Sequence, residues 1–118
     1  MNLKDQIVNS TDCNRQSVEV PEWGCTVYVR NLTAQDLDSW QCETYVTEGT
    51  NVDINRQNIR CRLLVRALVD EAGDRIFSNE EADLLGAKNT RIIDRLYKIA
   101  EKLNAVTPGD IEELAKNS

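Results

Sequence analysis

The stretch SVEVPEWGCTVYVRNL, residues 17–32, alternates apolar and polar side chains on both sides of a short turn. The apolar positions are Val18, Val20, Cys25, Val27 and Val29. A period of two is typical of a half-buried β-strand, and proline and glycine between two such runs indicate a hairpin. We therefore predict a β-hairpin over about residues 17–31. Because two strands alone are marginal in water, helices must cover the face that carries the valines.

A helix start follows the hairpin at once, in the sequence LTAQDLDSW. Thr33 is a typical N-cap residue, and Asp36 stands three residues later, near the positive end of the helix dipole. Leu32 and Leu37 occupy the two positions that pack together as a hydrophobic staple. We therefore predict a helix over about residues 33–48, which the sequence EGTN ends.

The next apolar residues repeat at helical spacing. They are Ile54, Ile59, Cys61, Leu63, Leu64 and Leu68. A broad apolar face of this kind is typical of a helix packed into the core, so we predict a central helix over about residues 52–70. Its last part, LLVRALV, is apolar almost all round, and a buried strand over Leu63–Val69 is the alternative. The length of the pattern favours the helix.

Two more helices follow. Ser78 and Glu81 form the pattern of a capping box, in which each side chain accepts a hydrogen bond from the other residue's backbone, and this predicts a helix over residues 78–85. A longer helix is predicted over residues 88–104, after the break at Gly86. Its apolar face is formed by Ile92, Ile93, Leu96, Ile99, Ala100 and Leu103.

The end of the chain contains one more helix start, with Thr107 as cap and Pro108 at the first helical position. It predicts a helix over residues 107–116. Near the beginning, Leu3, Ile7 and Val8 have the spacing of one or two helical turns. Residues 1–118 are therefore expected to form one α+β domain, an N-terminal β-hairpin packed against a mainly α-helical domain of about four to five helices.

The acidic stretch VDEAGDRIFSNEEADLLG, residues 69–86, has the composition of a calcium loop but not its pattern. Counted from Asp70, the third and sixth positions are Ala72 and Arg75, where a calcium loop of the EF-hand type needs an oxygen ligand and a glycine. We therefore interpret it as a turn at Gly73 followed by a short extended piece and the next helix start.

Composition excludes several kinds of chemistry. The chain has 20 acidic and 14 basic residues, a net charge of −6 and no histidine. A general nucleic-acid surface is unexpected at this charge, and no apolar run is long enough to span a membrane. Without histidine, the usual cysteine and serine nucleophile pairs are missing their base. We expect no catalytic, cofactor-binding or metal-binding residues, and therefore no enzyme.

The four cysteines have no close C-x-x-C pair among them, which makes a structural zinc site improbable. They are Cys13, Cys25, Cys42 and Cys61. The N-terminus has no secretory signal, so reduced and mostly buried thiols are favoured over two disulfides.

Four arginines lie at helical spacing in the predicted central helix: Arg56, Arg60, Arg62 and Arg66. They suggest either a phosphate-binding stripe or a solvated flank of the apolar face, paired in part with the acidic surplus. The acidic chain and the lack of aromatic residues between the arginines favour the solvated flank. If they bind a partner, an acidic protein is the better match.

Two long segments carry a resemblance to a known family. VEVPEWGCTVYVRNLT and the stretch from RCRLLVRALVDEAGDRIFSNEEADLLG to DRLYKIAEKLN and EELAKNS resemble the tail assembly chaperones of long-tailed, siphovirus-type bacteriophages or prophages. The resemblance covers about residues 18–118 and rests on the order and spacing of patterns, since none of these pieces is a catalytic motif.

This resemblance implies a non-enzymatic function. Proteins of the family bind the apolar tape measure protein, keep it soluble and help to recruit tail tube protein during tail assembly. It also implies a homo-oligomer in the cytoplasm of the bacterial host that is absent from the mature virion. A structural tail component, such as a completion or connector protein, and a small acidic protein-binding adaptor are the alternatives.

No family motif marks individual contact residues, so candidates come from residue type and position. The partner-binding candidates are Trp23, Trp40, Ile111, Leu114, Arg56 and Arg60. Tryptophan and arginine are enriched where protein interfaces derive most of their binding energy. Burial in the protein's own core is an equally good interpretation of the apolar candidates, and for Trp40 it is the favoured one.

Overall fold

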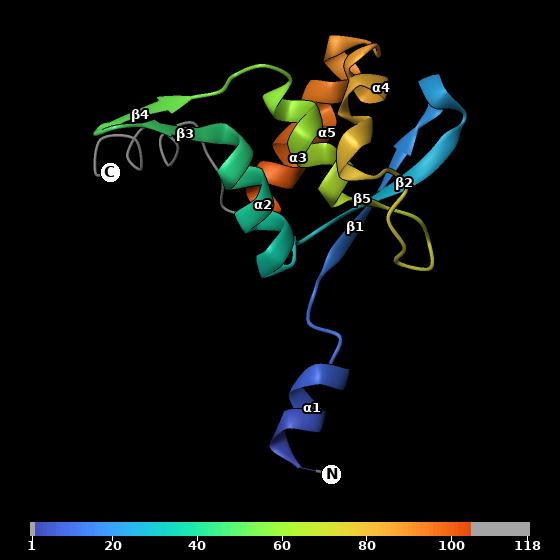
Figure 1. Ribbon diagram of the computed structural model, residues 1–118. Coiled ribbons are helices and arrows are strands. Elements are labelled where there is room, and N and C mark those ends of the chain that lie inside the picture. The colour runs from blue at the N-terminus through green and yellow to red at the C-terminus, as the bar shows by residue number, and fades with distance from the viewer. Residues whose placement is uncertain (1, 105–118) are drawn as a thin grey trace.

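The computed structural model describes residues 2–104 of the chain. It contains a three-stranded antiparallel sheet in the order β1-β2-β5, a separate two-stranded sheet β3-β4, and five α-helices (Figure 1). In chain order the elements are α1 (Leu3–Asn9), β1 (Arg15–Val20), the 3-10 turn η1 (Pro21–Trp23), β2 (Cys25–Arg30), α2 (Ala34–Thr44), β3 (Tyr45–Glu48), β4 (Asn51–Ile54), α3 (Ile59–Ala67), β5 (Leu68–Val69), the 3-10 turn η2 (Asn79–Glu81), α4 (Ala82–Gly86) and α5 (Thr90–Asn104). The α+β class and the N-terminal hairpin are as predicted. The predicted helix over residues 107–116 lies outside the described residues.

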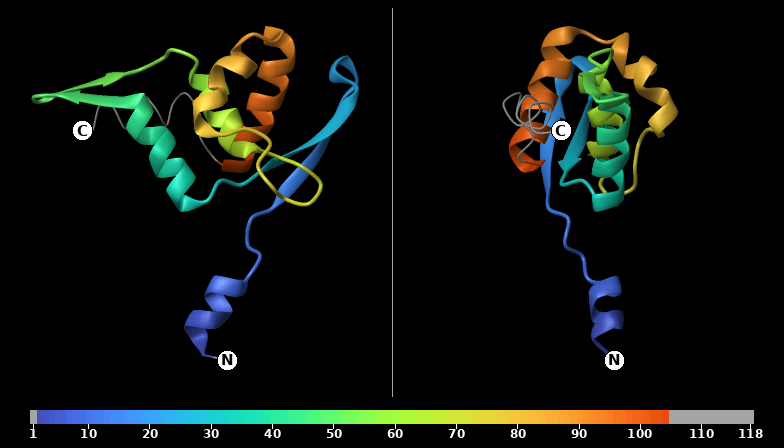
Figure 2. Two further views of the ribbon diagram at one scale, coloured as in Figure 1. Left: turned by 45° about the vertical axis from the view of Figure 1, so that its right-hand side comes forward. Right: turned by 60° about the vertical axis from the view of Figure 1, so that its left-hand side comes forward.

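The first hairpin has the predicted form. Val18 pairs with Val27, so both lie on one face of the sheet. The turn is a short 3-10 segment that begins at Pro21 and ends at Gly24, whose φ of 69° is accessible mainly to glycine. The helices α5 and α3 both contact β2, which places helical cover over the valines as two strands alone require (Figure 2).

The centre of the core is α3 together with β5. All residues from Cys61 to Val69 are buried, and α3 packs against α5 and α4. The chain changes from helix to strand at Leu68, where β5 pairs antiparallel with Tyr28 and Val29. Within Leu63–Val69 the predicted helix is therefore confirmed up to Ala67. The alternative, a buried strand, is found only at Leu68 and Val69.

The predicted helices over residues 33–48 and 52–70 are each wrong at one end. The structure replaces the end of the first and the start of the second by a second β-hairpin, β3-β4, with Gly49 at φ 61° in its turn. The segment TYVTEGTNVDI is rich in β-branched residues, which lose side-chain freedom in a helix and pack well in strands. Asn58, in the left-handed region at φ 54°, separates this hairpin from α3.

Two of the predicted helix starts are confirmed. The Asp36 backbone N–H donates to Thr33 Oγ1 at 3.2 Å, and the Ser78 N–H donates to Glu81 Oε1 at 2.7 Å within a capping box. The third predicted start, at Thr107, lies outside the described residues.

Replacing Thr33 by alanine should lower the free energy of unfolding by about 1 kcal/mol, because one backbone donor of α2 loses its acceptor. Thr33 is exposed, so the change removes little packing. The measurement is urea unfolding followed by circular dichroism. Thr33→Ser retains the oxygen and serves as the control. Equal stability of the serine and alanine variants would contradict the capping role.

The acidic loop after β5 is a turn closed by backbone hydrogen bonds and by the side chain of Asp70. The Asp74 N–H donates to Asp70 Oδ1 at 3.0 Å, the Asp70 N–H donates to the Asp74 carbonyl at 2.8 Å, and Gly73 has φ 92°. Arg75 then forms a β-bridge with Val69. Within residues 2–104, no group of three or more cysteine or acidic side chains is arranged to hold a metal ion.

All four thiols are free, but only Cys61 is buried. The expectation of mostly buried thiols is therefore wrong for Cys25 and Cys42, which are exposed, and Cys13 is half-buried. Cys25 is the first residue of β2, directly after the turn, and Cys42 lies on α2. No helix among residues 2–104 is both long and apolar enough to cross a membrane.

Candidate functional site

Two elements extend away from the helical body, α1 in one direction and the β3-β4 hairpin in another (Figures 1 and 2). None of the residues of α1 is buried. Its three large apolar side chains are mostly exposed, at 70% for Leu3, 65% for Ile7 and 70% for Val8. A helix that presents an apolar face with nothing packed on it has the form of a partner-binding element.

The β3-β4 hairpin has two different faces. Val46 pairs with Asp53 and Glu48 pairs with Asn51, so these four side chains lie on one face. That face is open to solvent, and Val46 is 41% exposed. On the other face, Tyr45 and Ile54 are half-buried and pack against the hydrophobic core. The hairpin is thus anchored at its base and presents an acidic surface outward.

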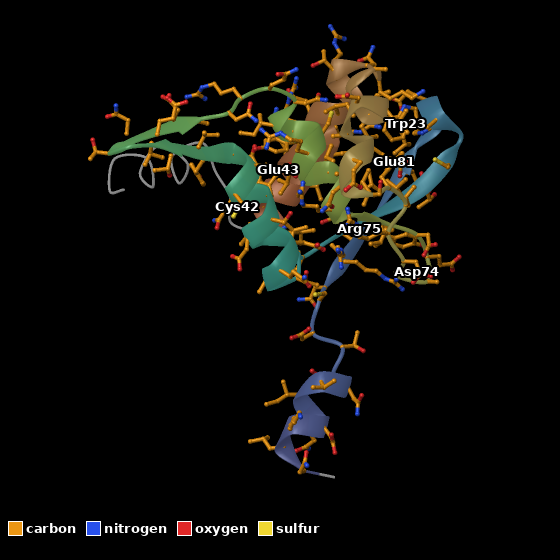
Figure 3. All side chains as sticks on the ribbon, viewed as in Figure 1. Trp23, Cys42, Glu43, Asp74, Arg75 and Glu81 are labelled. Atoms are coloured by element: carbon orange, nitrogen blue, oxygen red, sulfur yellow. The ribbon has the colours of Figure 1, made fainter. Side chains whose placement is uncertain are left out.

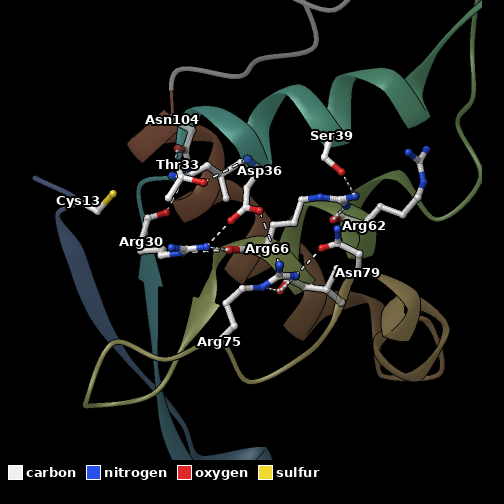
Figure 4. Close-up of polar contacts among 12 residues, drawn as sticks. Cys13, Arg30, Thr33, Asp36, Ser39, Arg62, Arg66, Arg75, Asn79 and Asn104 are labelled. Carbon is white, nitrogen blue, oxygen red and sulfur yellow. Dashed lines mark hydrogen bonds and ion pairs between the residues drawn. The ribbon is translucent and has the colours of Figure 1, made fainter. Parts of the chain in front are cut away.

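A network of arginines and carboxylates holds α2 against the body (Figure 4). Asp36, near the start of α2, lies 2.6 Å from Arg30 Nη2 and 3.7 Å from Arg75 Nη1. The same arginines also donate to backbone carbonyls, Arg30 to that of Arg66 and Arg75 to that of Val65. Burial lowers the pKa of Arg75 and Asp36 opposes that shift, so the carboxylate supports the charged form.

The second carboxylate on α2, Glu43, lies 2.8 Å from Arg66 Nη2 and 3.7 Å from Arg62 Nη1. The Arg66 side chain is fully buried, and its Nε has no hydrogen-bond partner in the described structure. Arg62 also donates to Thr44 Oγ1, and burial lowers its pKa while Glu43 opposes the shift. A desolvated arginine is tolerated only when paired, so α2 must stay in place to keep these charges compensated.

The interpretation of the four arginines as a solvated flank is therefore wrong for Arg62 and Arg66. Both are buried under α2, because that helix supplies the carboxylate and hydroxyl acceptors that a buried guanidinium needs. The interpretation holds for Arg56, which is exposed, and in part for Arg60. Arg60 donates to Asp94 at 2.8 Å and to Thr90 at 3.2 Å, in agreement with the expected pairing with acidic residues.

Arg56 and Arg60 also line a cavity of about 180 Å³ where α3 begins, α4 ends and α5 begins. Lys88 adds a third cation, and Ile59 and Ile93 are the apolar part of the wall. The buried thiol of Cys61 is at the same site, and burial raises its pKa. This cavity is therefore a locally basic concavity on an acidic protein, with a thiol that stays protonated at neutral pH.

The comparisons with known proteins agree with this architecture. A family described as phage tail assembly chaperone matches residues 2–117. The chain belongs to the phage tail assembly chaperone family. Its fold is similar to that in the structure of the bacteriophage HK97 tail assembly chaperone, at 23% sequence identity and a TM-score of 0.56, over 77% of this chain and 85% of that one. No curated protein matches the chain.

The predicted partner-binding residues of this tail assembly chaperone lie in different environments. Trp40 is fully buried, and its indole N–H donates to the Ile59 carbonyl at 3.3 Å, which confirms the preferred interpretation of Trp40 as a core residue. Trp23 lies at the end of the first hairpin and packs partly against the core (Figure 3). Ile111 and Leu114 lie outside the described residues. Arg56 and Arg60 are the two candidates that the structure brings together.

The end of the first hairpin is fixed to α5 by an ion pair. Arg95 contacts both carboxylate oxygens of Glu22 at 3.2 Å, and this hydrogen-bonded guanidinium lowers the pKa of Glu22. The end of the hairpin that carries Trp23 therefore contacts α5 through an exposed ion pair.

Sequence reasoning missed two features of this chaperone that are open to a partner. The helical spacing of Leu3, Ile7 and Val8 was recognised, but their exposure depends on α1 having no neighbour, which no local pattern reveals. The β3-β4 hairpin had a signal in the β-branched residues around EGTN, which compete with the helical periodicity on either side.

Proposed function

We propose that this protein is a non-enzymatic chaperone that binds the tape measure protein of a phage tail, keeps it soluble and helps to recruit tail tube protein. It acts as a homo-oligomer in the cytoplasm of the bacterial host and is not retained in the mature virion. Membership of the tail assembly chaperone family supports the assembly role. The tape measure protein and the tail tube protein are the partners that the family resemblance implies.

The observation that carries the proposal is the exposed apolar face of α1. A long helical partner with apolar stripes aggregates when those stripes are exposed to water, and an amphipathic helix can cover such a stripe. Leu3, Ile7 and Val8 present such a face at a distance from the core (Figure 1). The net charge of −6 then keeps the complex soluble by repulsion between complexes.

Replacing Leu3, Ile7 and Val8 together by serine should return the tape measure protein to the insoluble fraction when the two proteins are co-expressed. The physical reason is that α1 then has no apolar face to place on its partner, while the fold is unaffected because α1 contributes nothing to the core. The measurement is the soluble fraction of the tape measure protein after centrifugation, compared with expression alone.

The matched control replaces Lys4 and Gln6, polar residues of the same helix, by serine and should retain the solubilising effect. If the tape measure protein remains insoluble with the wild-type chaperone, the proposed function is wrong. If the triple-serine variant solubilises it as well as the wild type does, α1 is not the binding element. Mass spectrometry of purified particles tests localisation, since finding the protein there would favour a structural tail component.

A further inference from the structure

We propose that the basic cavity at the start of α3 receives the acidic outer face of the β3-β4 hairpin of a second copy of this chain. The inference rests on the homo-oligomer of the proposed function and names the two surfaces that meet. The cavity is the one lined by Arg56, Arg60 and Lys88.

Two of the three cationic side chains that line the cavity have no acidic partner in the described structure. Arg60 is already paired with Asp94 at 2.8 Å. Within residues 2–104, the side chains of Arg56 and Lys88 have neither an ion pair nor a hydrogen bond, and both are exposed. Two unpaired cations on one concavity of a chain with net charge −6 favour an acidic occupant.

The hairpin supplies the matching surface. Residues 43–54 contain three acidic residues and no basic one. Glu48 and Asp53 lie on the same face as the exposed side chain of Val46: Asp53 is directly opposite Val46, and Glu48 is two residues further along β3. Two carboxylates and one aliphatic group correspond to the two free cations and the half-buried Ile59 side chain of the cavity.

Within one chain the hairpin does not fill this cavity. Asp53 lies three residues before Arg56, but among residues 2–104 the two side chains form no ion pair, and Glu48 lies near the far end of the hairpin. β4 ends at Ile54, two residues before Arg56, so the cavity lies beside the base of its own hairpin. The turn at Gly49 lies at the other end of that four-residue strand, about 13 Å away at roughly 3.3 Å per residue. Because the hairpin is anchored at its base by Tyr45 and Ile54, its tip cannot fold back into its own cavity.

The contact joins two different surfaces of the same chain, so each copy uses its hairpin on one neighbour and its cavity on another. Such head-to-tail contacts close into rings or extend as open helical assemblies. Either form would display one α1 per copy along its length, which suits a long partner with repeated apolar stripes. The association should weaken as salt rises, since its charges are exposed.

The test uses two charge-reversed proteins, R56E/K88E and E48K/D53K, and sedimentation velocity over a range of protein concentrations. All four side chains are exposed, so both variants should fold as the wild type does, which circular dichroism checks. Each variant alone should need a protein concentration higher by about tenfold or more to associate, because like charges now meet. An equimolar mixture should associate again, since every contact in an alternating assembly pairs opposite charges.

The control K98E/K102E makes the net charge more negative by the same amount as R56E/K88E, but on the exposed surface of α5, and should associate like the wild type. The inference is overturned if the wild type remains monomeric, if both reversed variants associate as it does, or if their mixture stays apart. Solubilisation of the tape measure protein is measured in parallel. A monomeric wild type that still solubilises the tape measure protein removes this inference and the homo-oligomer but leaves the chaperone function. An oligomer that does not solubilise it removes the chaperone function and leaves the contact between copies.

Discussion

Replacing Trp40 by alanine should lower the free energy of unfolding by about 4 kcal/mol, the largest effect expected for a single side chain in this protein. Trp40 is fully buried, and it is the largest such side chain in the described structure. Its removal leaves a cavity between α2 and α3 and deprives the Ile59 carbonyl of its indole donor. Urea unfolding followed by circular dichroism and by fluorescence gives the change.

The matched comparison is Trp23→Ala. Trp23 packs only partly against the core, so its loss should cost about 1–2 kcal/mol. A similar cost for the two tryptophans would contradict the different burial of their side chains. Trp40→Phe should recover part of the loss, because it retains most of the apolar volume without the indole donor.

Asp36→Asn should lower the free energy of unfolding by about 3 kcal/mol, because it leaves two partly buried arginines without their shared carboxylate. Asp36 is the ion-pair partner of both Arg30 and Arg75. Asparagine has nearly the same shape and leaves the Thr33 cap intact, since that bond uses the Asp36 backbone. The change therefore isolates the charge. The measurement is urea unfolding followed by circular dichroism, from which the midpoint concentration and the slope of the free energy of unfolding against urea are obtained.

Asp38→Asn is the control, since Asp38 is on the same helix but is exposed. It should leave stability within about 0.5 kcal/mol of the wild type. The effect of Asp36→Asn should also persist in high salt, because partly buried pairs are screened less than surface pairs. Equal effects of the two substitutions, or a loss that salt abolishes, would show that Asp36 contributes only as a surface charge.

Both predictions concern the attachment of α2, and the β3-β4 hairpin follows α2 directly in the chain. Loosening α2 would also change the direction in which the hairpin projects. We therefore expect Asp36→Asn to weaken self-association at protein concentrations where the monomer remains folded, if the hairpin contacts a second copy as inferred.

The local patterns with a single strong period were sufficient for prediction. The valine alternation predicted the first hairpin, and its register places Val18 opposite Val27. The regular apolar face of residues 88–104 predicted α5 to within two residues. Thr33 and Ser78 marked the starts of two helices because a cap is a contact over three residues, which the sequence contains in full.

Prediction failed where two patterns compete or where the deciding contact is distant in sequence. The segment from Thr44 to Ile54 has apolar residues compatible with a helix, but its β-branched residues and Gly49 favour the hairpin. Arg62 and Arg66 resemble surface arginines in the sequence. Their burial depends on Glu43, which lies 23 residues from Arg66.

Local sequence patterns are enough to predict the α+β class, the first hairpin, the longest helix, two caps and the resemblance to a chaperone family, because each depends on neighbouring residues or on the order of patterns along the chain. Tertiary packing controls which charges are buried and which apolar residues are left uncovered. Leu3 is exposed because nothing packs on α1, and Arg66 is buried because α2 covers it. Exposure and desolvation depend on what lies next to a residue in space, and for this protein those neighbours are far apart in the chain.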